Sequence, residues 1–237
     1  MKRVSSVLGI LAFFWCLAGP AFGYIETFSS NNAGWLSLTI NNDGYVGSSS
    51  ALFSGSGGNP GGYVYACLPS NETRLYGIQA PFGTGRFGDL TGQTLTVDYR
   101  IDGSVSGPEG ARVRFYIGYY NDQSRYWVSN DSFSWDPNAN TSWTTHTIPL
   151  LESNFILWPN QNSGDMSFQE VLLHYNDIGL VFTNGDFTQI RNLGFSGCGT
   201  IHVDNFGVSA VPIPGAVWLL GSGLLGLAGL RRKSGKA

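Results

Sequence analysis

The sequence predicts an all-β sandwich with one short helix, placed between two apolar terminal segments. Short stretches of alternating apolar and polar residues recur along the middle of the chain, as in half-buried strands. Turn residues such as Asn42-Asp43-Gly44 separate them. One stretch, 168–175, follows the spacing of an amphipathic helix instead. We therefore expect two packed sheets with a helix at one end.

The first 23 residues have the composition of a signal peptide. Lys2 and Arg3 form a charged start, Val7–Ala18 is an apolar run, and Ala21-Phe22-Gly23 is a small-x-small cleavage site. We predict an N-terminal signal-peptide helix over 1–23 and an exported domain that begins at Tyr24.

Strands are expected where apolar side chains occupy alternate positions. Thr94–Ile101 shows this most clearly, because its four apolar side chains share one face: Leu95, Val97, Tyr99 and Ile101. The same reasoning predicts strands over 35–40, 62–67, 112–119, 143–150, 178–183 and 200–208. The glycine-rich stretch 55–62 is expected to be a loop between two strands.

One helix is predicted after Ser167. Ser167 and Glu170 have the spacing of a capping box, in which each side chain accepts a hydrogen bond from the other residue's backbone N–H. Apolar residues then follow at helical spacing: Phe168, Val171, Leu172 and Tyr175. We expect this helix to lie across one end of the sandwich.

The charge of the domain excludes several classes of partner. Six of the thirteen basic residues lie outside 24–210, so the domain keeps seven Arg, no Lys and all sixteen acidic residues, a formal charge of −9. Nucleic-acid binding needs a positive footprint, and anionic lipid repels such a surface. Excess carboxylate suits a hard cation such as Ca²⁺, and it also serves solubility alone. Both interpretations stay open at this point.

Two cysteines, Cys67 and Cys198, remain after removal of the signal peptide. In an exported protein an even number of cysteines indicates a disulfide. We therefore predict a Cys67–Cys198 bond. Two unpaired buried thiols are the alternative.

The C-terminal segment 211–237 has three parts. The first part is a Val-Pro-Ile-Pro motif formed by Val211, Pro212, Ile213 and Pro214. The second is an uncharged run over 213–230, which begins within this motif. The third is a basic end with Arg231, Arg232, Lys233 and Lys236. As a helix at about 1.5 Å per residue the uncharged run reaches roughly 27 Å, close to the bilayer core of about 30 Å. The basic end stays cytoplasmic by the positive-inside rule.

This tail, together with the signal peptide, resembles the PEP-CTERM proteins of Gram-negative bacteria. It is similar to the Val-Pro-hydrophobic-Pro variant, with Ile213 where the name-giving motif has Glu. The resemblance implies recognition by an exosortase in the inner membrane, a transient anchor through a C-terminal transmembrane helix, and a final place at the cell surface or in the medium. The predicted domains are therefore 1–23, 24–210 and 211–237.

Several segments of the middle domain follow one another in a specific order. They are Gly57–Val64, Phe87–Leu90, Leu95–Arg100, Trp143–Leu150, Phe168–Leu172 and Val203–Phe206. This order resembles the laminin B module, also called laminin domain IV. The resemblance implies a galactose-binding-like jelly roll without enzymatic activity.

Jelly rolls of the type that this resemblance implies often bind Ca²⁺ between the first and last strands. Glu26 and Asp204 occupy those places in this sequence, so we predict a structural calcium site there. The alternative is that Asp204 accepts hydrogen bonds from backbone amides at a strand edge.

Aromatic residues crowd the region 116–158. Most are expected in the core, but Trp127 and Trp135 lie in a stretch rich in Asn, Asp and Ser and are expected to be the most exposed. Exposed aromatic rings stack on sugar rings, so these two residues are the predicted ligand-stacking pair.

The sequence therefore favours a non-enzymatic module that binds carbohydrate or matrix, with an exopolysaccharide or another envelope glycan as partner and a role in biofilm. A secreted polysaccharide hydrolase and a purely structural biofilm protein are the alternatives. An exposed aromatic strip would favour the binding module, and two acids facing each other in a groove would favour the enzyme. The near nucleophile-elbow at Ser196 lacks the second glycine, and two GxGxxG matches lack the strand–turn–helix context.

Overall fold

The computed structural model describes residues 23–40, 46–68, 75–81, 83, 86–106, 111–119, 125–134, 142–158, 166–184 and 196–210. Apart from Gly23, the predicted signal peptide and the predicted sorting tail lie outside these residues, as does Trp135. Within the described ranges, no helix is long and apolar enough to cross a membrane.

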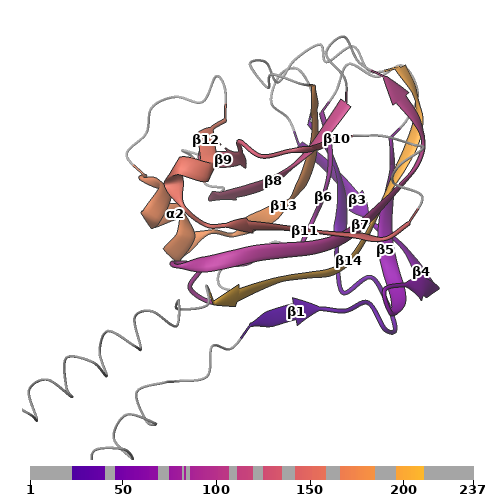
Figure 1. The fold of residues 1–237 in the computed structure, drawn as a ribbon, viewed down its shortest axis with the longest axis horizontal. Helices are drawn as coiled ribbons and strands as arrows, with labels where there is room; N and C mark the ends of the chain where they lie inside the picture. Colours follow the sequence, from indigo (N-terminus) through magenta and orange to yellow (C-terminus); the bar gives the residue numbers. More distant parts are fainter. Residues whose placement is uncertain are drawn as a thin grey trace, which may run out of the picture.

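Two antiparallel sheets pack face to face, which confirms the predicted β-sandwich with one short α-helix (Figure 1). The first sheet has the order β11-β7-β14-β5-β4, with β1 beside β14: β1 is Tyr24–Glu26, β4 Leu52–Gly58, β5 Gly61–Leu68, β7 Gln93–Ser106, β11 Thr144–Pro149 and β14 Ser196–Ala210. The second sheet has the order β12-β9-β8-β13-β6-β2-β3, with β10 beside β8: β2 is Leu36–Ile40, β3 Val46–Ser50, β6 Leu75–Gln79, β8 Ala111–Tyr119, β9 Arg125–Ser129, β10 Phe133–Ser134, β12 Phe155–Leu157 and β13 Asp177–Asn184. A 3₁₀ turn, η1 (Glu152–Asn154), leads from β11 in one sheet to β12 in the other.

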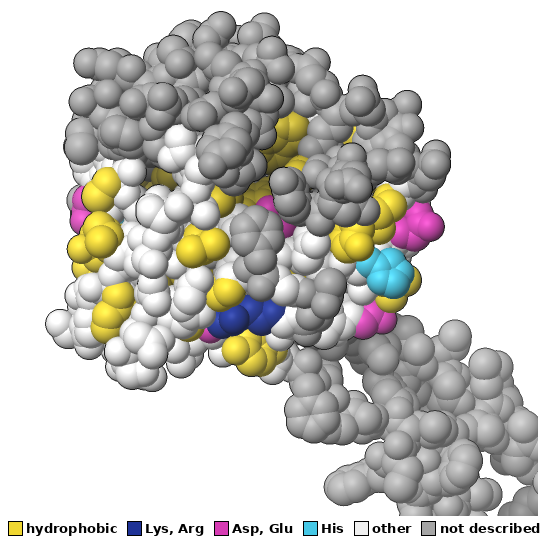
Figure 2. All heavy atoms as spheres, turned by 180° about the vertical axis from the view of Figure 1, so that it is seen from behind, with side chains coloured by type: hydrophobic (Ala, Val, Ile, Leu, Met, Phe, Trp, Pro, Cys, Tyr) yellow, Lys and Arg dark blue, Asp and Glu magenta, His cyan; other side chains and the backbone are white. Residues whose placement is uncertain are grey.

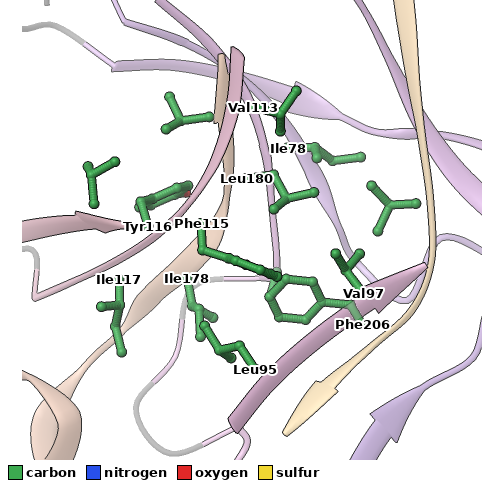
Figure 3. Packing of buried hydrophobic residues seen from close by; sticks show 14 of the residues in the cluster. Ile78, Leu95, Val97, Val113, Phe115, Tyr116, Ile117, Ile178, Leu180 and Phe206 are labelled. Carbon is green, nitrogen blue, oxygen red and sulfur yellow. The ribbon is translucent and has the colours of Figure 1, made fainter. Parts of the chain in front are cut away.

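The core lies between the sheets and follows from strand alternation. Leu95, Val97, Tyr99 and Ile101 of β7 are all buried, as predicted. Figure 3 shows Phe206 of β14 meeting Phe115 of β8 between the sheets, and their ring centroids are 6.1 Å apart. Apolar side chains from both sheets surround this pair, so the hydrophobic effect holds the two layers together.

The predicted helix is present as α2 (Phe168–His174), at one end of the sandwich (Figure 1). The capping box is confirmed: the Glu170 N–H donates to Ser167 Oγ at 3.3 Å, and the Ser167 N–H donates to Glu170 Oε2 at 2.7 Å. Phe168 is buried and contacts Phe155 and Trp127, with ring centroids 5.1 and 5.2 Å apart. The apolar side of α2 therefore closes that end of the core.

The glycine-rich stretch 55–62 was expected to be a loop, and this expectation is wrong. β4 continues to Gly58 and β5 begins at Gly61, so only Asn59 and Pro60 form the turn. The strands approach closely here, because a Cβ at Gly58 would lie 2.3 Å from the Gly62 carbonyl oxygen. Glycine is therefore required by contact between two backbones and not by a flexible connection.

Replacement of Phe206 by Ala should destabilise the domain by about 3–5 kcal/mol, because it leaves a cavity at the centre of the core. Phe206 is fully buried and contacts the rings of Trp35, Phe87 and Phe115. Urea unfolding measures the change. The control is Leu173→Ala on the exposed side of α2, for which a change within about 0.5 kcal/mol is expected. Equal losses in the two variants would contradict this account of the core.

Candidate functional site

Aromatic and charged side chains gather on the outer side of the first sheet. On β5, Val64 and Ala66 are buried in the core, so Tyr63 and Tyr65 point to the opposite side, where both are partly exposed. The register continues this row across two more strands, since His202 of β14 pairs with Tyr65 of β5 and with Arg100 of β7. We name this surface the aromatic face and define it by Tyr63, Tyr65, Arg100, Asp102, Trp143 and His202.

The rings of the aromatic face contact one another. Tyr63 lies at the centre, with ring centroids 5.8 Å from Tyr65, 5.1 Å from His202 and 5.5 Å from Trp143. Tyr65 and His202 stack at 5.7 Å with an interplanar angle of 25°. The indole N–H of Trp143 donates to the Gly57 carbonyl oxygen at 2.9 Å, which fixes the orientation of that ring. The result is a continuous platform of rings on a rigid sheet.

Arg100 is held against this platform. Its guanidinium carbon lies 5.6 Å from the Tyr63 ring centroid and 5.4 Å from that of Trp143, within the range of cation–π contacts. Arg100 Nη2 lies 3.3 Å from Asp102 Oδ2, and His202 Nε2 lies 2.7 Å from the same oxygen. Burial, and next the charge of Arg100, lower the pKa of His202, although Asp102 opposes them, so the imidazole is neutral at pH 7. The face therefore carries one cation and one exposed carboxylate side by side.

Two buried carboxylates, Asp98 and Asp204, anchor the edge of this face. Asp204 accepts the backbone N–H of Asn59 at 2.6 Å and that of Asn205 at 2.8 Å. Asp98 accepts from the side-chain amides of Asn59 at 3.1 Å and Asn205 at 2.7 Å, and from the Thr145 hydroxyl. Burial raises the pKa of Asp204, the amide donors oppose the shift, and Asp98 adds to it. These bonds fix the β4–β5 turn, next to the segment that holds Trp143.

The two residues of the predicted calcium site have protein partners. Glu26 accepts from the Trp35 indole N–H at 3.1 Å and from Arg86 Nε at 3.0 Å, and it forms an ion pair with Arg86. Asp204 accepts backbone amides, as the alternative interpretation described. Among the described residues no group of three or more His, Cys, Asp or Glu is placed to hold a metal. A calcium ion at Glu26 and Asp204 stays a prediction, and it would have to share both carboxylates with these donors. Thermal unfolding with Ca²⁺ and with EDTA tests it.

The predicted Cys67–Cys198 disulfide is not formed in this structure, because Cys67 is an exposed free thiol. The register explains the difference. Cys67 lies opposite Thr200, whose hydroxyl is 3.6 Å from the Cys67 sulfur, whereas the backbone of Cys198 pairs with Ser104. Cys198 is thus offset by two residues, and such diagonal neighbours lie about 7–8 Å apart, beyond the usual Cα distance of a disulfide.

The prediction that Trp127 is an exposed stacking residue is wrong. Its side chain is partly buried and packs against Phe168 of α2, because Trp127 pairs with Ile117 and shares the inward side of β8 and β9. Trp135 lies outside the described residues. Other aromatic residues of the region 116–158 are buried as expected: Tyr116, Phe155 and Trp158.

A partly exposed group of aromatic residues on the outer side of the first sheet is instead formed by residues that the sequence interpretation assigned to ordinary strands. Alternation within Gly62–Cys67 could have identified Tyr63 and Tyr65 as a pair on the outer side, opposite Val64 and Ala66. Arg100 and His202 could not be joined to them from local patterns. Their meeting depends on which strands pair and in which register.

The buried acids near this face, Asp98 and Asp204, are engaged in hydrogen bonds. Asp98 and Asp204 are cross-strand partners, but both are buried and both bind donors of the β4–β5 turn and the β14 bulge. Both ring nitrogens of His202 face charged partners, Asp102 and Arg100. The Ser196 side chain lies outside the described side chains.

Figure 2 shows the molecule from behind the view of Figure 1, with its charged side chains coloured. On the view in Figure 2, the coloured Lys and Arg side chains form one small patch, and the acidic side chains are separate from one another. This view shows no broad basic surface among the described side chains.

A buried polar cluster lies on β8, on the side opposite Phe115. The Tyr116 hydroxyl is 2.8 Å from Gln79 Oε1 and 2.8 Å from Asp177 Oδ1. Burial raises the pKa of Asp177 to about 6, although hydrogen bonds from Tyr116 and Tyr126 oppose the shift. All three members of the cluster are buried, so it contributes to stability and not to the accessible platform.

No protein-family model matches this chain, and no curated protein matches it. Solved structures of similar fold include the family 11 carbohydrate-binding module from Clostridium thermocellum in complex with a β-1,3-1,4-mixed-linked tetrasaccharide. It has a TM-score of 0.50 and 18% identity, and the match covers 80% of this chain and 96% of that chain. The L4b domain of human laminin α-2 has a TM-score of 0.47 and 10% identity, over 81% of this chain and 99% of that chain. The first of these likenesses shows a shared β-sandwich fold.

Replacement of Asp177 by Asn should remove a pH-dependent part of the stability. The folded-state pKa of about 6 lies above the ordinary value of 3.8, so between about pH 4 and 6 the folded state holds more protons than the unfolded state. The free energy of unfolding contributed by Asp177 therefore falls as the pH rises through this window. The difference in the free energy of unfolding between Asp177→Asn and wild type should therefore shift by roughly 1–3 kcal/mol in favour of the variant from pH 4 to pH 7. Urea unfolding at each pH measures the difference, and parallel pH profiles for the two proteins would contradict it.

Proposed function

We propose that this protein is an exported, non-catalytic glycan-binding module. The observation that carries the proposal is the aromatic face, where the partly exposed rings of Tyr63, Tyr65 and Trp143 lie around the buried His202, beside Arg100 and Asp102. Apolar faces of pyranose rings stack on aromatic rings, and charged or polar side chains at the rim receive the sugar hydroxyls.

The platform fits a polymer better than a single sugar. Tyr63 and Tyr65 are alternate residues of one strand, about 7 Å apart along its axis, and the row through Tyr65, His202 and Arg100 crosses three strands. A surface of this kind offers several neighbouring contacts for a sugar chain on one sheet. The fold shared with a carbohydrate-binding module in complex with a mixed-linked tetrasaccharide supports this assignment.

A binding role also agrees with the state of the acids. Asp98 and Asp204 hold the β4–β5 turn, and Asp102 lies between Arg100 and His202. A hydrolase would need two carboxylates free to protonate a leaving group and to assist attack. A purely structural biofilm protein is the remaining alternative, and glycan binding distinguishes the two.

The terminal segments supply the proposed setting. We infer from the sequence that the signal peptide exports the chain through the inner membrane of a Gram-negative cell, and that the segment 211–237 anchors it until an exosortase processes it. The partner would then be an exopolysaccharide or another glycan of the envelope. These inferences rest on the Val-Pro-Ile-Pro motif, the apolar run and the basic end.

Mass spectrometry of the mature surface or secreted protein should show the C-terminus trimmed near residues 211–215. When processing is blocked, the protein should fractionate with the inner membrane, because the uncharged run 213–230 is long enough to span it. Recovery of the intact terminus at Ala237 from secreted material would refute the sorting proposal.

Replacement of Tyr63 or Tyr65 by Ala should weaken glycan binding at least tenfold, which corresponds to about 1.4 kcal/mol, because each change removes a stacking surface. A glycan array identifies the polysaccharide, and isothermal titration with the purified protein gives the affinity. The matched control is Tyr24→Ala, since Tyr24 is a more exposed tyrosine that lies on β1 and contacts Phe87. Equal binding by wild type and the Tyr63 and Tyr65 variants, or no binding to any glycan, would argue against the proposed function.

A further inference from the structure

We propose that the aromatic face selects uncharged glycans over acidic ones, and that Asp102 sets this preference. The inference rests on the proposed glycan-binding function and names the class of polymer that the same face accepts. Its starting point is the charge distribution on the face. An acidic polymer such as a polyuronate presents one carboxylate on each sugar, so the sign of the exposed charges decides its binding.

Arg100 is the cation of this face, and it is already neutralised. Its Nη2 lies 3.3 Å from Asp102 Oδ2, and Asp102 is the more exposed of the two side chains, at 48% against 22%. His202, which lies against both, supplies no positive charge at pH 7. A carboxylate that approached the platform would therefore meet the Asp102 carboxylate before an unpaired guanidinium.

The geometry of Arg100 points to the same conclusion. Its guanidinium packs against the Tyr63 and Trp143 rings, and its Nη2 faces both Asp102 and His202. The group is thus held against the rings and does not project from them as a fork for carboxylates. Hydroxyl groups of an uncharged sugar can still accept from Arg100 or donate to Asp102.

The surrounding charge adds to this local effect. Asp98 is buried on β7, the strand that carries Arg100 and Asp102, and the domain 24–210 has a formal charge of −9. A field of this sign lowers the local concentration of polyanions, most strongly at low ionic strength. Neutral polymers are unaffected by it.

Titration of the purified full-length protein with two probes tests the proposal: mixed-linked β-1,3-1,4-glucan as the uncharged polymer and polygalacturonate as the acidic one. Wild type should bind the glucan at least tenfold more tightly. Asp102→Asn keeps an acceptor oxygen for His202 but leaves the Arg100 charge unpaired, so its ratio of glucan to polygalacturonate affinity should fall at least tenfold. The gained binding should weaken as salt rises, and the double variant with Arg100→Gln should lose it.

Glu152→Gln is the matched control, because it removes one exposed negative charge on η1, away from the aromatic face. It should leave the ratio of glucan affinity to polygalacturonate affinity at the wild-type value. A fall in this ratio equal to that of Asp102→Asn would assign the preference to net charge alone and overturn the role of Asp102. Binding of the glucan with an unchanged ratio in Asp102→Asn, or tighter binding of polygalacturonate by wild type, would overturn this inference and leave the proposed function intact. Failure of wild type to bind either probe or any arrayed glycan would overturn both.

Discussion

The structure depends on one β-bulge in the last strand. Val203 and Phe206 are both buried in the core, which strict alternation would forbid, and the register of β14 against β7 shifts between Asp204 and Gly207 to allow it. Asn205 takes up the extra residue with a φ of +46°, in the left-handed region that Asn tolerates better than most residues. Phe206 then enters the core, while the Asp204 carboxylate and the Asn205 amide are left to bind Asn59.

The same bulge organises both sides of the first sheet. Beyond it, Gly207 lets β1 approach, because a Cβ there would lie 2.2 Å from the Tyr24 carbonyl oxygen. Before it, His202 keeps the outward orientation that brings it into one row with Tyr65 and Arg100. A substitution at the bulge would therefore affect the core, the pairing of the first strand and the aromatic face together.

The buried acids around the first sheet are held by two different arrangements. Glu26 is neutralised by Arg86 and receives the Trp35 indole, so its carboxylate has a full set of donors. Asp98 and Asp204 use amides in place of a cation, which holds the turn between β4 and β5 without adding positive charge. Loss of one of these partners would leave a buried charge uncompensated, which is strongly destabilising. The exposed pair Arg100 and Asp102 can therefore determine the character of the aromatic face.

The sequence by itself determined the fold class and some of the elements of this fold. Alternation identified β7 and the buried side of its four apolar residues, and the spacing of Ser167 and Glu170 identified the start of α2, because both patterns depend on neighbours along the chain. Tertiary structure decided which side chains meet. Trp127 packs inward against Phe168, and Thr200, not Cys198, lies opposite Cys67. Glu26 forms an ion pair with Arg86. Tertiary structure also assembled Tyr65, His202 and Arg100 from three strands that are distant in sequence. The register between such strands is set by packing of the whole core, and no local pattern records it.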